Sequence, residues 1–71
     1  MLFITQAREN GFIVTRLGSS KNKEGSFEVG AKVTSPQAAV SVYNSVVHTL
    51  SMSGVEFTAV PYQELEMVAQ V

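Results

Sequence analysis

The first half of the chain alternates between strand-forming segments and turn residues. Residues 2–7 and 12–17 are rich in β-branched and aromatic side chains, which is typical of strands. Between them stands Asn10-Gly11, a pair well suited to a two-residue type I′ turn, because both central residues of that turn need positive φ angles. The sequence therefore predicts a hairpin with three pairs: Glu9 with Phe12, Ala7 with Val14, and Thr5 with Arg16.

A third strand is predicted over residues 26–34, after a loop at residues 18–25 that consists largely of turn formers. Within this strand, apolar side chains alternate with polar or small ones, as expected of an antiparallel strand that buries one face. The apolar positions are Phe27, Val29, Ala31 and Val33.

The following segment has the periodicity of an amphipathic helix. Ser35 is a suitable N-cap, and Pro36 fits the first helical position, where no backbone N–H is needed. Gly54 can adopt the left-handed conformation that ends a helix. The apolar stripe that would face the sheet is formed by Ala39, Val40, Tyr43, Val46, Val47 and Leu50.

A fourth strand is predicted at residues 55–60, and the tail that follows it, Tyr62–Val71, fits two patterns. Its Gln, Glu, Leu, Met and Ala content favours a helix, whereas its alternation fits a strand, and we favour the helix. Residues 1–71 then form one small α+β domain with an antiparallel sheet of three or four strands in the order β-β-β-α-β. The long helix packs on one face of the sheet, so the other face should be open to water or covered by a partner.

Composition argues against catalysis. The chain contains no Cys and one His, and its six acidic residues are all Glu, so disulfides, thiolate metal sites and histidine-rich metal sites are excluded. A Ser-His-acid triad would depend on His48, and no residue spacing supports one. The loop at residues 18–25 is basic and flanked by glycines, but it lacks the Walker A residue order and leads into a strand. We expect no enzymatic activity, no metal and no cofactor.

Membrane signals are also lacking in the sequence. No signal peptide is recognisable, and no run approaches the roughly 20 apolar residues that span a bilayer. We therefore expect a cytoplasmic protein that does not contact membranes.

Positive charge is confined to the N-terminal part of the chain, although the net charge is only −1. The five basic residues are Arg8, Arg16, Lys21, Lys23 and Lys32. On a three-stranded meander several of them would share one surface, which suits an acidic protein partner. The same surface would alternatively bind the phosphates of nucleic acid. We favour this alternative less, because Glu9, Glu24 and Glu28 dilute the positive charge.

The predicted helix, in contrast, carries no formal charge, and neither do its flanks between Lys32 and Glu56. An exposed helix face normally carries charge for solubility. The side opposite the apolar stripe presents small or neutral residues, including Ser41, Ser45, His48 and Met52, and methionine adapts to varied contacts. We interpret this side as a second candidate interface, for a foreign protein or for a second copy of the chain, although uncharged helix faces also occur without a partner.

Part of the chain resembles small phage-encoded host-takeover proteins. Ser26-Phe27-Glu28-Val29, a capped Ala/Val-rich helix and Gly54-Val55-Glu56-Phe57-Thr58 follow, in this order, the layout of the T7-type inhibitor of bacterial RNA polymerase. Several anti-CRISPR proteins look similar. The resemblance covers residues 26–60, while the N-terminal hairpin has no counterpart and the helix lacks the acidic residues of the polymerase inhibitor. It implies a class of small, non-enzymatic proteins that occupy a surface of a larger machine.

The sequence thus predicts a small, non-enzymatic binding protein that acts by stoichiometric protein–protein contact, of the kind that phages encode to inhibit host machines. Two alternatives stay open. One is a nucleic-acid-binding accessory protein that uses the basic N-terminal half. The other is a structural or assembly protein, such as a homodimer.

Overall fold

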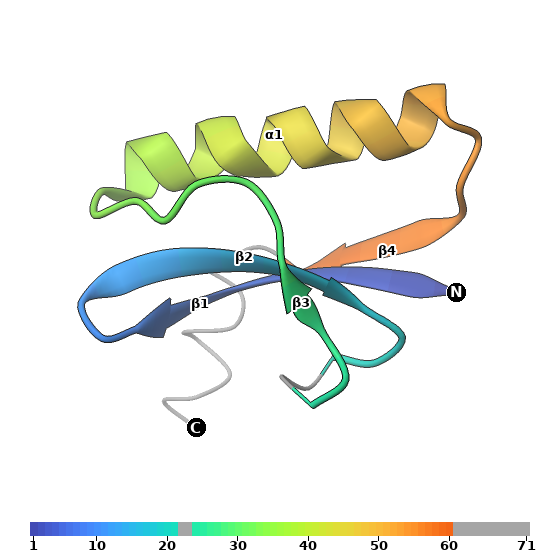
Figure 1. Cartoon of the computed structure of the whole chain (residues 1–71). Helices are drawn as coiled ribbons and strands as arrows, with labels where there is room; N and C mark the ends of the chain where they lie inside the picture. The colour runs from blue at the N-terminus through green and yellow to red at the C-terminus, as the bar shows by residue number, and fades with distance from the viewer. Residues whose placement is uncertain (22–23, 61–71) are drawn as a thin grey trace.

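The computed structural model describes residues 1–21 and 24–60. This part of the chain forms one four-stranded sheet with a single helix across one of its faces (Figure 1). The elements in chain order are β1 (Leu2–Glu9), β2 (Phe12–Gly18), β3 (Phe27–Glu28), α1 (Pro36–Met52) and β4 (Phe57–Val60). The predicted α+β class and the predicted order of elements are confirmed. The tail Tyr62–Val71, for which we favoured a helix, lies outside the described residues.

The hairpin of β1 and β2 has the predicted register. Glu9 pairs with Phe12, Ala7 with Val14, and Thr5 with Arg16. The turn between the strands is made by Asn10 and Gly11, with φ angles of 53° and 84°. Both residues therefore adopt the left-handed conformation that a primed two-residue turn requires.

The sheet is mixed, so the prediction of an antiparallel sheet was wrong. The strand order is β3-β2-β1-β4, and β4 pairs in parallel with β1, with Leu2 opposite Phe57 and Ile4 opposite Ala59. The cause is the helical crossover. Strand β3 runs parallel to β1, because both are antiparallel to β2. The 17 residues of α1, about 25 Å long, carry the chain back along the sheet, so β4 returns in the direction of β3 and β1.

The third strand is much shorter than predicted. Only Phe27 and Glu28 pair with β2 as a strand, and the chain rejoins β2 through a single bridge between Val33 and Ile13. Gly30 interrupts the strand with a φ angle of +73°. A Cβ atom at Gly30 would lie 2.7 Å from Cγ1 of Val42, so the strand breaks at a position where α1 lies close to the backbone. Two positions of the predicted buried face, Phe27 and Ala31, are exposed.

The core lies between α1 and the sheet and is centred on Ile13 and Ala39, each 2% exposed. Val33 packs against this pair. Five of the six positions of the predicted helical stripe are buried or partly buried. The sixth, Val40, is 50% exposed, whereas Val42, which was not assigned to the stripe, is partly buried and faces Gly30. Val40 lies about 100° around the helix from Ala39, which places it beyond the edge of the packed face.

The opposite face of the sheet, which we expected to be open to water or covered by a partner, contains two buried residues, Val14 and Thr5. Val14 is 2% exposed and Thr5 is 7% exposed. An ion pair between Arg16 and Glu9 lies on this face. The two residues stand on either side of the Ala7–Val14 pair, so the side chains that join them must pass over it. The methylene stem of Arg16 thereby covers apolar surface while its charged end is paired.

Candidate binding surfaces

The ends of α1 are fixed by neutral caps. The Ser35 hydroxyl accepts a hydrogen bond of 3.2 Å from the Ala38 backbone N–H, and Pro36 occupies the first helical position. The first turn contains no acidic residue and the last turn no basic one, although the helix dipole would favour such charges. Gly54 follows the helix with a φ angle of +72°. The helix thus remains uncharged even where charge would stabilise it.

The side of α1 that faces away from the sheet is exposed along its length. We define the outer face of α1 as the five residues Val40, Ser41, Ser45, His48 and Met52, all of which are exposed. Met52 is 76% exposed and Val40 is 50% exposed. The structure therefore brings the four helical residues singled out from the sequence together on one surface, and it adds Val40, which the sequence assigned to the core.

Several hydroxyl groups on α1 are bonded to the helix itself. The Ser41 hydroxyl donates to the Gln37 carbonyl at 3.5 Å, and the Thr49 hydroxyl donates to the Ser45 carbonyl at 3.0 Å. Such bonds satisfy the side-chain donor within its own helix. The surface of α1 therefore offers a partner fewer hydroxyl donors than its Ser and Thr content indicates.

An apolar groove borders the outer face of α1. It lies between the helix and the edge of the sheet, and its volume is about 340 Å³. The lining residues are Leu17, Val29, Gly30, Ser45, Val46, Thr49 and Leu50. Sequence reasoning did not foresee this groove, because it assigned residues 26–34 to a continuous strand. Gly30 was the available signal, since a glycine inside a strand pattern often marks a bend or a close backbone approach.

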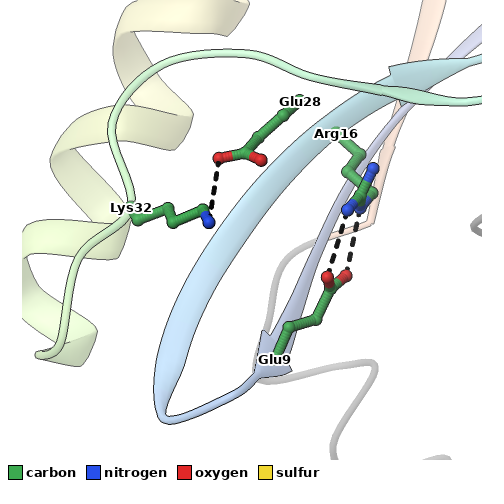
Figure 2. A network of polar contacts seen from close by, with 4 residues as sticks. All are labelled: Glu9, Arg16, Glu28 and Lys32. Carbon is green, nitrogen blue, oxygen red and sulfur yellow. Dashed lines mark hydrogen bonds and ion pairs between the residues drawn. The ribbon is translucent and has the colours of Figure 1, made fainter.

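The basic residues are partly neutralised by glutamates. Arg16 donates two hydrogen bonds to the carboxylate of Glu9, of 3.0 Å from Nε and 3.1 Å from Nη2, and Figure 2 shows the two groups facing each other in parallel. The hydrogen bond to Glu9 raises the pKa of the Arg16 guanidinium above its ordinary value, because the carboxylate stabilises the charged form. Lys32 Nζ lies 4.0 Å from Glu28 Oε1 (Figure 2).

The described basic residues also do not gather on one side of the sheet. Arg8 is in register with Ile13, which packs toward α1, whereas Arg16 is in register with Thr5 on the opposite face. Lys21 is exposed in the loop after β2, and Lys23 lies outside the described residues. The single basic surface expected from the sequence is therefore not assembled by Arg8 and Arg16.

Two features are absent from residues 1–21 and 24–60. In these residues no group of three or more His, Cys, Asp or Glu side chains lies close enough to hold a metal ion. No helix there is long and apolar enough to cross a membrane.

Comparison of the chain with protein-family models, with curated proteins and with solved structures finds no match.

Proposed function

We propose that this protein is a small, non-enzymatic binding protein that acts by stoichiometric contact with another protein, and that the outer face of α1 is its contact surface. The observation that carries this proposal is the combination of exposure and neutrality on one helix. Val40 and Met52 are 50% and 76% exposed, and no charged residue accompanies them between Lys32 and Glu56.

A solvent-exposed helix face gains solubility from charged residues. A helix without any charged residue is therefore less soluble when it is exposed to water. This disadvantage disappears when another surface covers the helix, because charged residues at the centre of an interface must be desolvated. Interface centres are accordingly depleted in charge, and methionine is enriched there. The outer face of α1 has these properties, and its small Ser residues permit close approach of a second surface.

The neutral outer face of α1 favours a partner whose contact surface is mainly neutral rather than strongly acidic. Two of the basic residues that would attract an acidic partner, Arg16 and Lys32, already face Glu9 and Glu28. Lys21, which is exposed near one end of β2, supplies charge at the periphery. The resemblance of residues 26–60 to phage-encoded inhibitors supports the same class of action, in which a small protein occupies a surface of a larger machine.

The proposal is tested by affinity capture from a bacterial lysate with the tagged protein, in parallel samples with and without nuclease. Two variants, Ser41→Lys and Met52→Glu, place charge on the outer face of α1, and Lys21→Glu is the control that changes charge elsewhere. We expect one protein to be retained in near-stoichiometric amount in both samples, to be lost with the two helix variants and to be retained with the control.

Two results would count against the proposal. Capture that disappears after nuclease treatment would identify nucleic acid as the ligand. A partner that binds the two helix variants as well as the unmodified protein would place the contact on a different surface.

A further inference from the structure

The sheet face opposite α1 contains buried side chains, although no described helix or strand lies on it. Val14 is 2% exposed and Thr5 is 7% exposed. Val14 is adjacent to Ile13, which packs against Ala39 of α1, so the side chain of Val14 points to the opposite face. Figure 1 shows α1 and the segment between β3 and α1 on one side of the sheet. These exposures belong to a single copy of the chain, so the covering residues are part of the same chain.

The ion pair between Arg16 and Glu9 on this face is covered as well. Its side chains pass over Val14, so on an uncovered sheet they would be the outermost groups and would lie mostly in water. They are instead only 17% and 19% exposed, no more than half the exposure of either side chain in the Lys32–Glu28 pair. The stem of Arg16 can cover Val14, but neither partner can shield the outer side of the ion pair. A further layer of chain is therefore needed above it.

The described connections between elements do not supply this layer. The loop after β2 leaves the sheet at Gly18, which is at the end of the hairpin away from Glu9. The segment between β3 and α1 lies on the helix side, where Val33 packs against Ile13. Residues 53–56 join α1 to β4 at an edge of the described sheet. The layer must therefore come from residues beyond Val60, since residues 22–23 are too few to form one.

Residues 61–71 begin beside this face and are long enough to cross it. Val60, the last residue of β4, pairs in parallel with Thr5, so the two side chains lie on the same face of the sheet. Val14 lies two strands away from Val60, about 10 Å across the sheet and about 7 Å along it. An extended chain spans about 3.3 Å per residue, so roughly four residues after Val60 suffice to reach Val14.

The sequence of residues 61–71 has a side suited to a buried surface. Leu65 and Ala69 are four residues apart, so they share one side of the segment whether it forms a helix or a strand. Glu64 and Glu66 flank Leu65 and can remain in water in both cases. The surface beneath is mainly apolar, with its one described ion pair already neutralised, so an apolar cover meets no unpaired charge there.

We propose that residues 61–71 fold back from the end of β4 as a strap over the sheet face opposite α1, with Leu65 packed over Val14 and the Arg16–Glu9 pair. The sheet is then the middle of three layers, between α1 on one side and the strap on the other. The strap excludes water from the ion pair and from the apolar surface beneath it. This proposal concerns the face away from α1 and does not depend on the function proposed above.

Two neighbouring buried residues provide matched probes of the strap. Ile13 and Val14 are each 2% exposed but lie on opposite faces, and the chain has no cysteine. Ile13→Cys and Val14→Cys therefore each carry a single thiol, whose rate of alkylation by iodoacetamide reports the exposure of one face. In full-length chains, Leu65→Glu should accelerate alkylation at position 14 by about tenfold or more, as expected when a buried leucine contact is lost, and leave position 13 unchanged.

Gln70→Glu is the control for the strap variant. It introduces the same charge five residues from Leu65, a spacing that places it away from the Leu65 side in a helix and in a strand. It should leave alkylation at position 14 slow. Unchanged alkylation at position 14 in Leu65→Glu would overturn the proposal, as would equal acceleration at positions 13 and 14.

A second measurement uses the unmodified protein and so does not depend on how the variants fold. Nuclear Overhauser effects between methyl groups report which side chains are in contact in solution. We expect cross-peaks between Val14 and Leu65, with cross-peaks between Ile13 and Ala39 as the internal reference for the other face. A spectrum that contains the reference cross-peaks but none between Val14 and residues 61–71 would overturn the proposal.

Discussion

The side-chain amide of Gln6 in β1 donates a hydrogen bond of 2.8 Å to the backbone carbonyl of Ala39 in α1. The same nitrogen lies 3.0 Å from the hydroxyl oxygen of Thr15 in β2, and Gln6 and Thr15 are each 2% exposed. One buried amide thus connects both central strands to the helix. Because an unpaired polar group in a low-dielectric interior is costly, this connection fixes the position of α1 over the sheet.

Replacing Gln6 with leucine should lower the free energy of unfolding by about 1–3 kcal/mol, because the Thr15 hydroxyl and the Ala39 carbonyl lose a buried partner. The double variant Gln6→Leu/Thr15→Val removes both side-chain polar groups and should recover part of this loss. Urea denaturation of the two variants measures the difference. If the double variant is no more stable than Gln6→Leu alone, the loss of stability comes from the changed side-chain shape rather than from the lost hydrogen bonds.

Gly30 should be the glycine least tolerant of substitution among Gly11, Gly25, Gly30 and Gly54, which all have positive φ angles. In Gly54→Ala, the new Cβ would meet nothing within 4 Å at a φ angle of +72°, so the expected cost is that of the left-handed backbone, about 1–2 kcal/mol. In Gly30→Ala, the φ angle is nearly the same, but the new Cβ would lie 2.7 Å from Cγ1 of Val42. The added crowding should cost about 1–3 kcal/mol more.

The crowding at Gly30 can be separated from backbone strain by a second substitution. Val42→Ala removes the methyl group that the new Cβ would touch, so Gly30→Ala should be less harmful in a Val42→Ala background than in the unmodified protein. Thermal unfolding of the four proteins in this cycle measures the coupling. Additive effects of the two substitutions would contradict the proposed contact.

Removing the N-cap of α1 should lower the stability of the protein. Ser35→Ala removes the acceptor of the Ala38 N–H bond and should destabilise the protein by about 1 kcal/mol. Ser51→Ala is a matched control, since Ser51 is an exposed residue near the other end of the helix, where alanine is favoured by helix propensity. Helix content followed by circular dichroism during thermal unfolding should fall at lower temperature only for Ser35→Ala.

Arg16 should stabilise the protein by an amount that does not change between neutral and mildly alkaline pH. Its pKa is raised by the hydrogen bond to Glu9, and a group with a raised pKa gives full stabilisation below its unfolded-state pKa. That contribution is lost only as the pH rises through the folded-state pKa, which for a guanidinium lies in strongly alkaline solution. The difference in melting temperature between the unmodified protein and Arg16→Met, which keeps most of the stem over Val14, should therefore be constant over this pH range.

Local signals in the sequence predicted the elements whose ends are set by single residues. Asn10-Gly11 fixed the hairpin register, because a two-residue turn allows only one pairing. Ser35, Pro36 and Gly54 marked the ends of α1. In each case the physical cause lies in a few residues adjacent in the chain, so it can be recognised without knowledge of the rest of the fold.

The errors concern contacts between distant parts of the chain. The alternation of residues 26–34 is compatible with a strand, but Gly30 adopts a φ angle of +73° beside Val42 of α1, and the strand does not continue through it. Val40 falls at the edge of the apolar stripe, where the packing of α1 on Ile13 decides which side is buried. The parallel pairing of β4 was accessible by reasoning, because a helix between two strands returns the chain in its original direction.

The candidate surfaces also combine features that neighbouring residues determine with features that depend on contacts between distant residues. The neutral character of α1 is a property of consecutive residues and was visible in the sequence. Arg8 and Arg16 lie on opposite faces of the sheet because side chains alternate along the strands of the hairpin. The predicted register of the hairpin already implied this separation. The groove is lined in part by Gly30, where the predicted strand breaks, and the sequence marked this position only by a glycine within a strand pattern.

The parallel pairing of β1 with β4 has a consequence for the order of events during synthesis. Strand β1 is synthesised before the other described elements, and it lies in the interior of the described sheet between β2 and β4. Its partner on one side, Phe57–Val60, is translated after every other described element. One edge of a nascent hairpin therefore stays unpaired until translation has passed Val60, and contacts so distant in sequence form slowly. A chain that stalls before this point would present β1 as an open template for other strands.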